Sequence, residues 1–268
     1  MKKLLILIFI LLHGAEFLHA QGEIDQQQRV FFRNERSFGL SINSDGFGIG
    51  YREARRKNYL NKRILEFDLG LLKHPKEYKT SNPWAQNTGT FVFGKLNSVV
   101  YFRGGLGHQR EIFSKEDAGG IAIRYFYSGG PVISLQKPIY YRVLYPVGGT
   151  LNEYQLKEEK FDIRVHDPTM IYSKAGLTKG INEIKALPGL YAKGGFNFEY
   201  SREDKVIHAI EIGAQINAFP KKIPIMDSQD NKAIFFSIFA SYRFGVIVDP
   251  LHPEDSNISN LFRRKKVQ

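Results

Sequence analysis

The sequence has 268 residues, a net charge of +11 and a hydrophobic share of 43%, and it contains no cysteine. The lack of cysteine excludes disulfide bonds, thiol catalysis and a lipid-modified N-terminal cysteine. The basic balance indicates a polyanionic partner, but it does not separate nucleic acid from phosphorylated lipid headgroups.

Residues 1–20 have the pattern of a cleaved signal peptide. Lys2 and Lys3 precede an apolar run, residues 4–12, which is shorter than the roughly 20 residues that span a bilayer. An exported chain meets lipid phosphates first, so we expect outer-membrane lipid and lipopolysaccharide as partners and no nucleic acid. After residue 20 no stretch of about 18 apolar residues recurs, and only β-strands could cross a membrane.

Residues 37–245 alternate with a period of two, which is typical of strands with one apolar face. Leu65, Phe67 and Leu69 share one face, for example, while Glu66 and Asp68 share the other. The pattern predicts an all-β fold: an antiparallel up-and-down transmembrane β-barrel of about ten strands, within a range of eight to twelve. The predicted strands are 38–43, 47–52, 63–71, 91–93, 100–107, 121–127, 132–145, 190–200, 210–217 and 236–244.

The lengths of the connections predict which end of the barrel faces the periplasm, because outer-membrane barrels have short periplasmic turns and longer external loops. An even strand count also leaves both chain ends in the periplasm. The short, periplasmic connections are predicted at 58–62, 95–98, 128–131 and 202–205. The external ones are predicted at 44–46, 73–89, 113–119, 148–187 and 220–232.

These boundaries divide the chain into four parts: a signal peptide (1–20), an N-terminal periplasmic segment (21–36), the barrel (37–245) and a short basic periplasmic tail (246–268). A soluble β-sandwich would also alternate. The membrane barrel is favoured by aromatic residues near predicted strand ends, by charges of both signs in mid-strand, and by the export signal.

The chain resembles the small outer-membrane β-barrel families of bacteroidete-type bacteria over residues 29–245. Five segments carry the resemblance: Phe32–Leu40, Lys73–Glu77, Phe93–Asn97, Ser128–Pro131 and Pro188–Lys193. These are patterns of a fold and not of an active site. The resemblance implies the location and the architecture, and it leaves the activity open.

The alternation turns ten charged side chains toward the barrel interior. Side chains nearly fill a barrel of eight to ten strands, so the charges are expected to form a packed ionic network. A narrow conducting pore is the alternative, because rings of charge also tune ion selectivity. The predicted interior residues are Arg52, Glu66, Asp68, Arg103, Arg124, Arg142, Lys193, Glu199, Glu211 and Arg243.

Candidate sites for metal chemistry are weak. Asp162, His166 and Asp167 have metal-ligating side chains. The four-residue spacing of Asp162 and His166 brings ligands together only on a helix, and Pro168 directly follows Asp167. Residues 173–185 are expected to form a short helix over the barrel mouth. We therefore expect no metal site.

Catalysis is not expected either. His74 and His108 fall near predicted external strand ends, and Ser81 and Ser114 lie in adjoining loops, yet nothing in the sequence brings a nucleophile and a base together. We predict neither catalytic residues nor a cofactor.

The tail contains four consecutive basic residues, Arg263, Arg264, Lys265 and Lys266. They form either a solvated chain end or a contact for inner-leaflet phosphates, peptidoglycan carboxylates or a partner protein. The expected function is a non-enzymatic integral outer-membrane barrel, structural or a subunit of an envelope assembly or secretion complex. A narrow channel for ions or small solutes and an outer-membrane hydrolase acting on lipid are the two alternatives.

Overall fold

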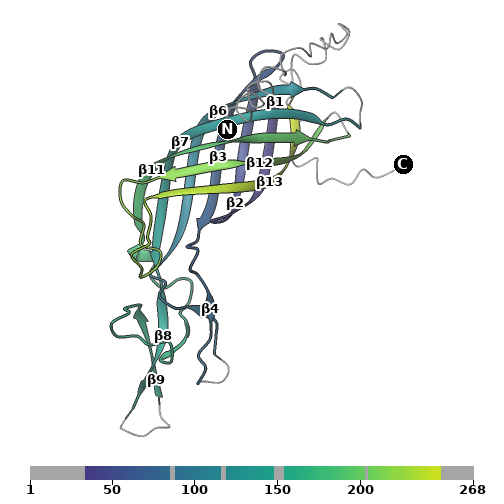
Figure 1. The fold of residues 1–268 in the computed structure, drawn as a ribbon. Helices are drawn as coiled ribbons and strands as arrows, with labels where there is room; N and C mark the ends of the chain where they lie inside the picture. Colours follow the sequence, from purple (N-terminus) through teal and green to yellow (C-terminus); the bar gives the residue numbers. More distant parts are fainter. Residues whose placement is uncertain (1–33, 85–87, 116–118, 148–153, 203–204, 249–268) are drawn as a thin grey trace, which may run out of the picture. The chain divides into compact units, whose positions relative to one another are not determined.

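The computed structural model describes residues 34–84, 88–115, 119–147, 154–202 and 205–248, all within the compact unit Phe32–Gln268. Eight long antiparallel strands close into a barrel in the order β1-β13-β12-β11-β7-β6-β3-β2 (Figure 1). This count lies within the predicted range of eight to twelve. The barrel strands are β1 (Asn34–Asn43), β2 (Gly46–Arg56), β3 (Asn61–Leu72), β6 (Asn97–Phe113), β7 (Ala122–Pro138), β11 (Lys185–Glu199), β12 (Val206–Ala218) and β13 (Ile234–Val248).

The remaining strands lie in the two longest connections. Between β3 and β6, a two-stranded sheet pairs β4 (Lys79–Thr80) with β5 (Phe91–Val92). Between β7 and β11, a three-stranded sheet has the order β10-β8-β9. Its strands are β8 (Tyr140–Pro146), β9 (Tyr154–Lys160) and β10 (Ile171–Lys174), and a 3-10 turn follows at Ile181–Glu183. No helix in the described part of the chain is long and apolar enough to span a membrane.

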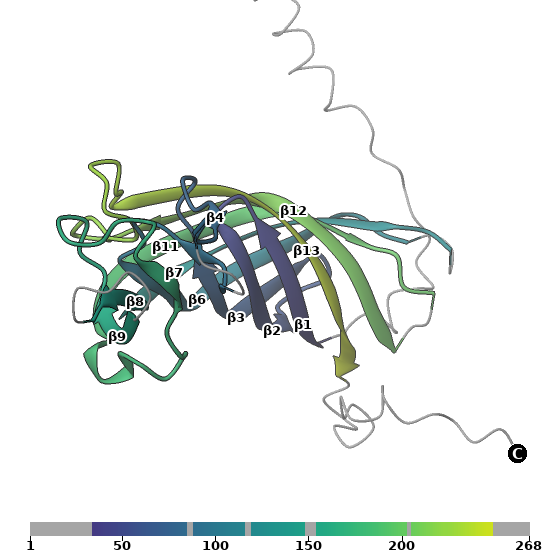
Figure 2. The same cartoon turned by 90° about the horizontal axis from the view of Figure 1, so that it is seen from below.

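The barrel closes by pairing its first and last strands, with Asn34 opposite Val248 and Asn43 opposite Phe239. Figure 2 shows the strands curving around into one wall. We call the end with Asn34 and Val248 the terminal end. Its connections, 57–60, 114–121 and 200–205, are short.

We call the opposite end the loop end. It has the tight turn at Ser44 and Asp45 and three long connections, 73–96, 139–184 and 219–233. The chain enters and leaves the barrel at the same end, as an even number of strands requires. The predicted connections 58–62 and 202–205 correspond to short connections of the terminal end, and the predicted connections 44–46, 73–89, 148–187 and 220–232 correspond to the four connections of the loop end.

Two predicted strands are not separate barrel strands. The predicted turn at Ser128–Pro131 lies inside β7, which runs unbroken from Ala122 to Pro138. A Cβ on Gly130 would collide with the backbone of Gly104 and Gly105 on β6. The glycines therefore mark a close approach of two strands and not a hairpin, which is the other common role of glycine in a strand.

The predicted fourth strand, 91–93, also lies outside the barrel. Phe91 belongs to β5 of the two-stranded sheet. Its ring packs against Tyr141, with 6.0 Å between ring centroids, in the apolar core of the three-stranded sheet. Phe93 packs edge-on against Phe161. A period of two does not distinguish an aromatic residue that faces a small core from one on the outside of a barrel, and this explains the wrong assignment.

These two corrections change three boundaries. The segment 95–98, predicted to be periplasmic, lies at the loop end before β6, and the segment 113–119, predicted to be external, lies at the terminal end. The predicted strand 132–145 is divided at Pro138 between β7 and β8. Proline has no N–H to continue the ladder, and Pro138 pairs with Asn97, the first residue of β6.

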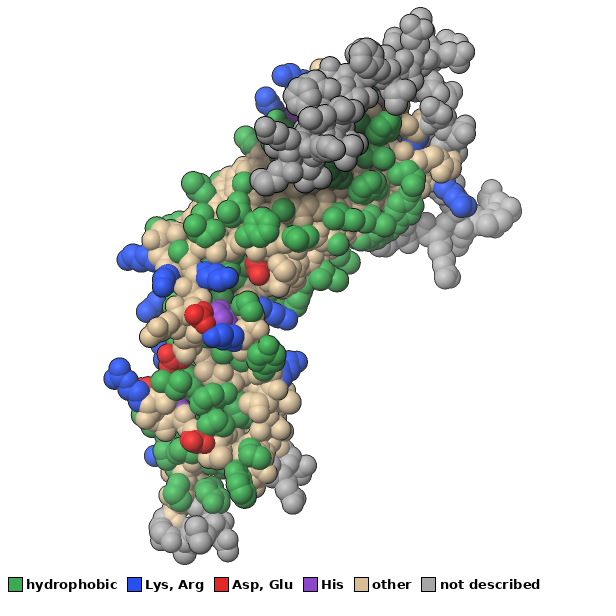
Figure 3. Space-filling view, in the orientation of Figure 1, with side chains coloured by type: hydrophobic (Ala, Val, Ile, Leu, Met, Phe, Trp, Pro, Cys, Tyr) green, Lys and Arg blue, Asp and Glu red, His purple; other side chains and the backbone are tan. Residues whose placement is uncertain are grey.

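The outside of the barrel is apolar. Large hydrophobic side chains alternate with buried polar ones along the strands, and many are more than half exposed, such as Ile42 (74%) and Leu190 (68%). Figure 3 shows hydrophobic side chains spread over this face of the barrel, with Lys and Arg side chains gathered beyond one end of it. The barrel therefore has the reverse of the polarity of a water-soluble protein.

Candidate functional site

The centre of the barrel holds a buried ionic cluster. Arg52 on β2 binds Glu66 on β3, with 2.9 Å between Nη2 and Oε2, and it also donates to Glu211 on β12. Arg243 on β13 donates from Nε to Glu211 over 2.7 Å and lies 3.4 Å from Glu66. All four side chains are almost completely buried. Glu66 and Glu211 thus each contact both arginines, Arg52 on β2 and Arg243 on β13.

The cluster continues toward the loop end. Lys193 on β11 binds Glu66 and lies 3.3 Å from Asp68. Arg103 on β6 donates to Asp68 over 3.1 Å and to the amide oxygen of Gln215 over 3.0 Å. We call these residues together the central ionic cluster: Arg52, Glu66, Asp68, Arg103, Lys193, Glu211 and Arg243.

Neutral hydrogen-bond donors complete the coordination of Glu211. The side-chain amide of Asn197 donates to one carboxylate oxygen over 3.0 Å, and the hydroxyl of Ser241 donates to the other over 3.2 Å. Buried charge is tolerated only when its partners replace the lost water. The central ionic cluster meets this condition at Glu211, where both oxygens have several donors.

A second group of charges lies near the terminal end, and we call it the terminal ionic cluster. Arg124 on β7 binds Glu199, lies 3.0 Å from Glu111 and 3.6 Å from Glu35. Lys62 binds Glu35, and Lys115 lies 3.2 Å from Glu199. Three cations and three carboxylates are therefore paired here: Glu35, Lys62, Glu111, Lys115, Arg124 and Glu199.

Apolar side chains separate the two ionic clusters. Along β3, Ile64 lies between Lys62 and Glu66, and it packs in a buried cluster with Ala54, Phe126 and Phe239. The rings of Phe126 and Phe239 have centroids 6.4 Å apart.

Two cations of the central ionic cluster cover these rings. The Arg52 guanidinium lies 4.5 Å from the Phe126 centroid, and the Lys193 ammonium lies 5.0 Å from the Phe239 centroid. Cation–π contacts of this kind keep charged and aromatic groups packed together. A continuous stack of side chains therefore fills the middle of the barrel.

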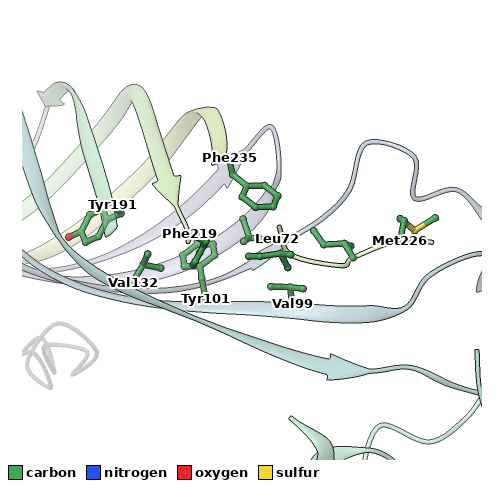
Figure 4. Packing of buried hydrophobic residues seen from close by; sticks show 10 residues of the cluster. Leu72, Val99, Tyr101, Val132, Tyr191, Phe219, Met226 and Phe235 are labelled. Atoms are coloured by element: carbon green, nitrogen blue, oxygen red, sulfur yellow. The ribbon is translucent and has the colours of Figure 1, made fainter. Parts of the chain in front are cut away.

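The connection 219–233 fills the loop end. Asn97 donates to Pro224 O over 2.6 Å, and the N–H of Leu96 donates to Ile225 O over 2.9 Å, which fastens the connection to the start of β6. Its apolar side chains join those of the barrel wall, and Figure 4 shows Phe219 beside Tyr101 and Leu72 inside the strands. The buried cluster is Leu72, Val99, Tyr101, Val132, Tyr191, Phe219, Ile223, Ile225, Met226 and Phe235.

The structure brings nine of the ten predicted interior residues into the lumen, divided between the two ionic clusters. Arg142 is the exception. It lies on β8 in the small sheet, is half exposed, and pairs with Glu158 over 3.4 Å. The error follows from treating residues 132–145 as one strand, because the barrel strand ends at Pro138 and β8 belongs to another sheet.

Four further lumen charges escaped the sequence prediction: Glu35, Lys62, Glu111 and Lys115. The first three lie on barrel strands beyond the predicted ends and keep the parity of the interior residues. Continuing the period-two pattern to the actual strand ends would have found them. Lys115 lies in the connection after β6, where no periodicity applies.

The candidate metal-binding and catalytic residues have separate structural partners. The Asp162 N–H donates to His166 Nδ1 over 3.0 Å, which ties the start of a loop to its end. The predicted helix 173–185 is absent from the described residues of that segment, which contains the end of β10 and the turn Ile181–Glu183. Among the described residues, no group of three or more potential ligands could hold a metal ion.

The rings of the histidines considered for catalysis contact groups other than a serine hydroxyl. His74 Nδ1 accepts from the Lys76 N–H over 3.2 Å, and His108 Nε2 lies 3.0 Å from Asn61 Oδ1. His108 lies toward the terminal end of β6, at the opposite end of the barrel from the long connections beside which it was predicted. The signal peptide 1–20 and the basic residues 263–266 lie outside the described residues.

A closed antiparallel barrel that is apolar outside and ionic inside has the construction of a β-barrel suited to a lipid bilayer. No protein-family model matches the sequence, and no match is found among the curated proteins.

Among solved structures, the chain is similar to two small outer-membrane barrels. The attachment invasion locus protein Ail of Yersinia pestis, in complex with the heparin analogue sucrose octasulfate, aligns at 9% identity and a TM-score of 0.34, covering 81% of this chain and 97% of Ail. Neisserial surface protein A aligns at 11% identity and a TM-score of 0.34, covering 80% of this chain and 96% of that protein.

Proposed function

We propose that this chain is an integral outer-membrane protein whose barrel spans the bilayer, does not conduct, and anchors the small sheets of the loop end outside the membrane. The observation that carries the proposal is the reversed polarity of the barrel, with large apolar side chains exposed and paired charges buried. The signal peptide predicted in residues 1–20 would direct its export.

The dimensions of the apolar surface support a membrane-spanning barrel. Outward side chains on β13 run from Ile234 to Phe244. This span corresponds to about 33 Å along a strand at roughly 3.3 Å per residue, and to about 25 Å along the barrel axis for a tilt of about 40°. The apolar band of outer-membrane barrels is about 25 Å tall.

Aromatic residues at the terminal end support the same depth. His208 Nδ1 lies 2.7 Å from the hydroxyl of Tyr242, and the two rings are stacked with centroids 6.2 Å apart. Tyr200 also stacks on His208, with 6.3 Å between ring centroids. Side chains with an apolar body and a polar end are typical of the bilayer interface.

The packed lumen supports an anchor over a channel. Removing a charge from water is costly, and the ionic clusters offset this cost with pairs that hold the walls of the barrel together. The apolar cluster around Phe126 and the apolar side chains of connection 219–233 add two further buried layers inside the barrel. A conducting pore would need a hydrated path past each of these layers.

The three-stranded sheet of the loop end supports a role in binding another protein. It has its own apolar core, in which Tyr141, Val143 and Ile171 are buried with Phe161. Such a folded unit in the connections beyond the barrel is suited to contact another envelope protein. The assignment to an envelope assembly or secretion complex, and to the barrel families of bacteroidete-type bacteria, is part of this proposal.

Lipid hydrolysis is the least supported alternative. An acyl hydrolase needs a nucleophile hydrogen-bonded to a base, and the described rings of His74, His108 and His208 contact other partners than serine hydroxyls. The basic residues 263–266 would lie in the periplasm and contact phosphates or carboxylates there.

Cell fractionation and gel mobility test the membrane assignment. We expect the protein in the outer-membrane fraction, with an unboiled form that migrates differently from the boiled form, as folded barrels resist denaturation by detergent. A soluble periplasmic protein with no such difference would contradict the proposal.

Planar bilayers test the closed lumen. Purified protein should insert without steady conductance above that of the bilayer alone, because the lumen is packed from the terminal ionic cluster to connection 219–233. Reproducible single-channel steps would show instead that the barrel is a channel. Crosslinking in intact cells, followed by detergent extraction, tests for a protein partner.

A further inference from the structure

We propose that an outward-facing group of arginines at the terminal end binds the phosphate of an anionic phospholipid from the adjacent leaflet. We call Arg36, Arg55, Arg63 and Arg110 the arginine patch; they lie on the neighbouring strands β1, β2, β3 and β6. This inference rests on the proposed membrane-spanning function and names a lipid class and a site for it.

The register of the strands brings like charges directly together. Arg55 on β2 is opposite Arg63 on β3, and Arg63 is opposite His108 on β6. Opposite side chains on one face of a sheet have Cβ atoms about 5 Å apart, and like charges in this position destabilise the pair. Two flexible arginine side chains that start this close together can turn their guanidinium groups toward one anion.

The described chain supplies little negative charge to these arginines. Glu53 is the one outward carboxylate among the described residues of these four strands at this end, and it pairs with Arg55 over 3.1 Å. Arg55 remains 72% exposed in this pair. Because one carboxylate serves four arginines, an external anion would relieve the repulsion between Arg55 and Arg63.

The arginine patch lies at the depth of lipid headgroups. Leu65 follows Arg63 by two residues on the outward face of β3, and Leu106 is directly opposite Leu65 on β6. Two residues along a strand correspond to about 6.6 Å. A lipid whose acyl chains lie against Leu65 and Leu106 would hold its phosphate beside Arg63.

The other half of the terminal end has a different composition. On β7, β11, β12 and β13 the described outward positions near this end are aliphatic or aromatic, as with Ile123, His208 and Tyr242. The cations Arg202 and Lys205 lie in the connection beyond these strands. The arginine patch is therefore a localised site on one side of the barrel and not a uniform positive ring.

Arginine is the residue best suited to this ligand. A guanidinium presents a planar fork of N–H donors that binds two phosphate oxygens at once. The first barrel strand begins and the last barrel strand ends at the terminal end, so in an outer-membrane barrel this end faces the periplasm, where the leaflet consists of phospholipid. We therefore assign the site to the phosphodiester of an anionic phospholipid such as phosphatidylglycerol.

Spin-labelled lipids in reconstituted vesicles test the site. The protein is reconstituted in phosphatidylcholine with a trace of spin-labelled phosphatidylglycerol or spin-labelled phosphatidylcholine, and the immobilised fraction of each lipid is measured. The variant is Arg55→Gln with Arg63→Gln. The matched control is Arg142→Gln with Arg164→Gln, which removes two exposed arginines from the loop end.

We expect the wild-type protein to immobilise phosphatidylglycerol in preference to phosphatidylcholine. Loss of two interfacial basic residues should reduce this preference about 30-fold, while the control keeps it. The inference is wrong if the double variant retains the preference, or if the control loses it equally. It is also wrong if inorganic phosphate competes fully with the lipid, because the site would then bind free phosphate.

Insertion is measured on the same samples, by mobility on unboiled gels and by protection from protease. Inserted wild-type barrels with no lipid preference would overturn this inference and leave the membrane-spanning function intact. Failure of the wild-type protein to insert would overturn both. Arg55 and Arg63 are exposed, so their substitution leaves the packed lumen unchanged.

Discussion

Glu66 and Glu211 face each other across the barrel, and the guanidinium of Arg52 binds both. Their strands, β3 and β12, are separated by β2, β1 and β13 on one side and by β6, β7 and β11 on the other. Two carboxylates from opposite walls are thus joined through one cation. This arrangement ties together strands that share no backbone hydrogen bonds.

Substitution of Glu211 by Gln should strongly destabilise the barrel. The change leaves Arg52 and Arg243 buried with one fewer carboxylate, and breaking a buried ion pair in this way costs about 3–5 kcal/mol. The measurement is the free energy of unfolding in a denaturant titration of the reconstituted protein. The control is Glu158→Gln, whose half-exposed pair with Arg142 contributes under about 1 kcal/mol. Equal effects of the two changes would contradict a stabilising role for the central ionic cluster.

A second prediction separates a lipid-facing surface from a water-facing one. Ile238 and Ile234 lie on the same face of β13 and are similarly exposed, at 62% and 56%. Ile238 is near the middle of the apolar band and Ile234 near its edge. Arginine at Ile238 should cost about 2–4 kcal/mol in a bilayer, whereas arginine at Ile234 should cost about 0–1 kcal/mol.

The same unfolding titration measures both variants. If water surrounded the barrel, both substitutions would change the free energy of unfolding by a similar and small amount, because both side chains are exposed on the folded barrel. A depth-dependent cost therefore supports the bilayer directly. Its absence would argue for a soluble protein.

Part of this fold could be predicted because the physical pattern is local. Residues 63–71 alternate without interruption, and they form β3 with Glu66 and Asp68 inside. Parity on each barrel strand sorts interior from exterior positions. The ion pairs that use them, such as Lys193 with Glu66, join residues far apart in sequence, and parity alone does not identify the partners.

The errors occurred where two structures share one local pattern. Ser128–Pro131 contains the residues of a turn, yet Gly130 is needed for the close approach of β7 to β6. Phe91 alternates like a lipid-facing residue and is buried in the core of a small sheet. Only contacts between distant segments distinguish these cases, and a single sequence does not contain them.

A third prediction is that the three-stranded sheet β10-β8-β9 unfolds independently of the barrel. Tyr141 is buried in its core, and its hydroxyl donates to Val92 O over 2.6 Å. Tyr141→Ala should destabilise the packing by about 3–5 kcal/mol, the usual cost of deleting a buried aromatic ring. We expect faster proteolysis within residues 139–184, with the unboiled gel mobility of the barrel unchanged.

Tyr154→Ala is the matched control, because Tyr154 lies on β9 with its side chain exposed. Its effect on proteolysis should be small. Loss of the folded gel mobility in the Tyr141 variant would show that the small sheet and the barrel unfold as one unit.

The last prediction concerns charge at the loop end, where Lys174 lies at the end of β10. Burial lowers the pKa of Lys174 below its ordinary value, and the nearby positive charges of Lys137 and Lys95 lower it further, against the opposing effect of Glu77. Lys137→Gln removes one of these like charges. The pKa of Lys174 should therefore rise toward the ordinary lysine value, as measured from its Nζ resonance during a pH titration. Lys179→Gln, which removes an exposed lysine paired with Glu158, is the control and should leave the pKa unchanged.

The direction of the effect on stability follows from proton binding. Because the pKa of Lys174 is lowered in the folded protein, the unfolded chain binds this proton more tightly, and the contribution of Lys174 to folding becomes more favourable as pH rises. The gain begins near the lowered pKa and ends at the unfolded value of about 10.4. Lys137→Gln should make this rise smaller, because it narrows the interval between the two pKa values. A larger rise in the variant would contradict the mutual repulsion of Lys137 and Lys174.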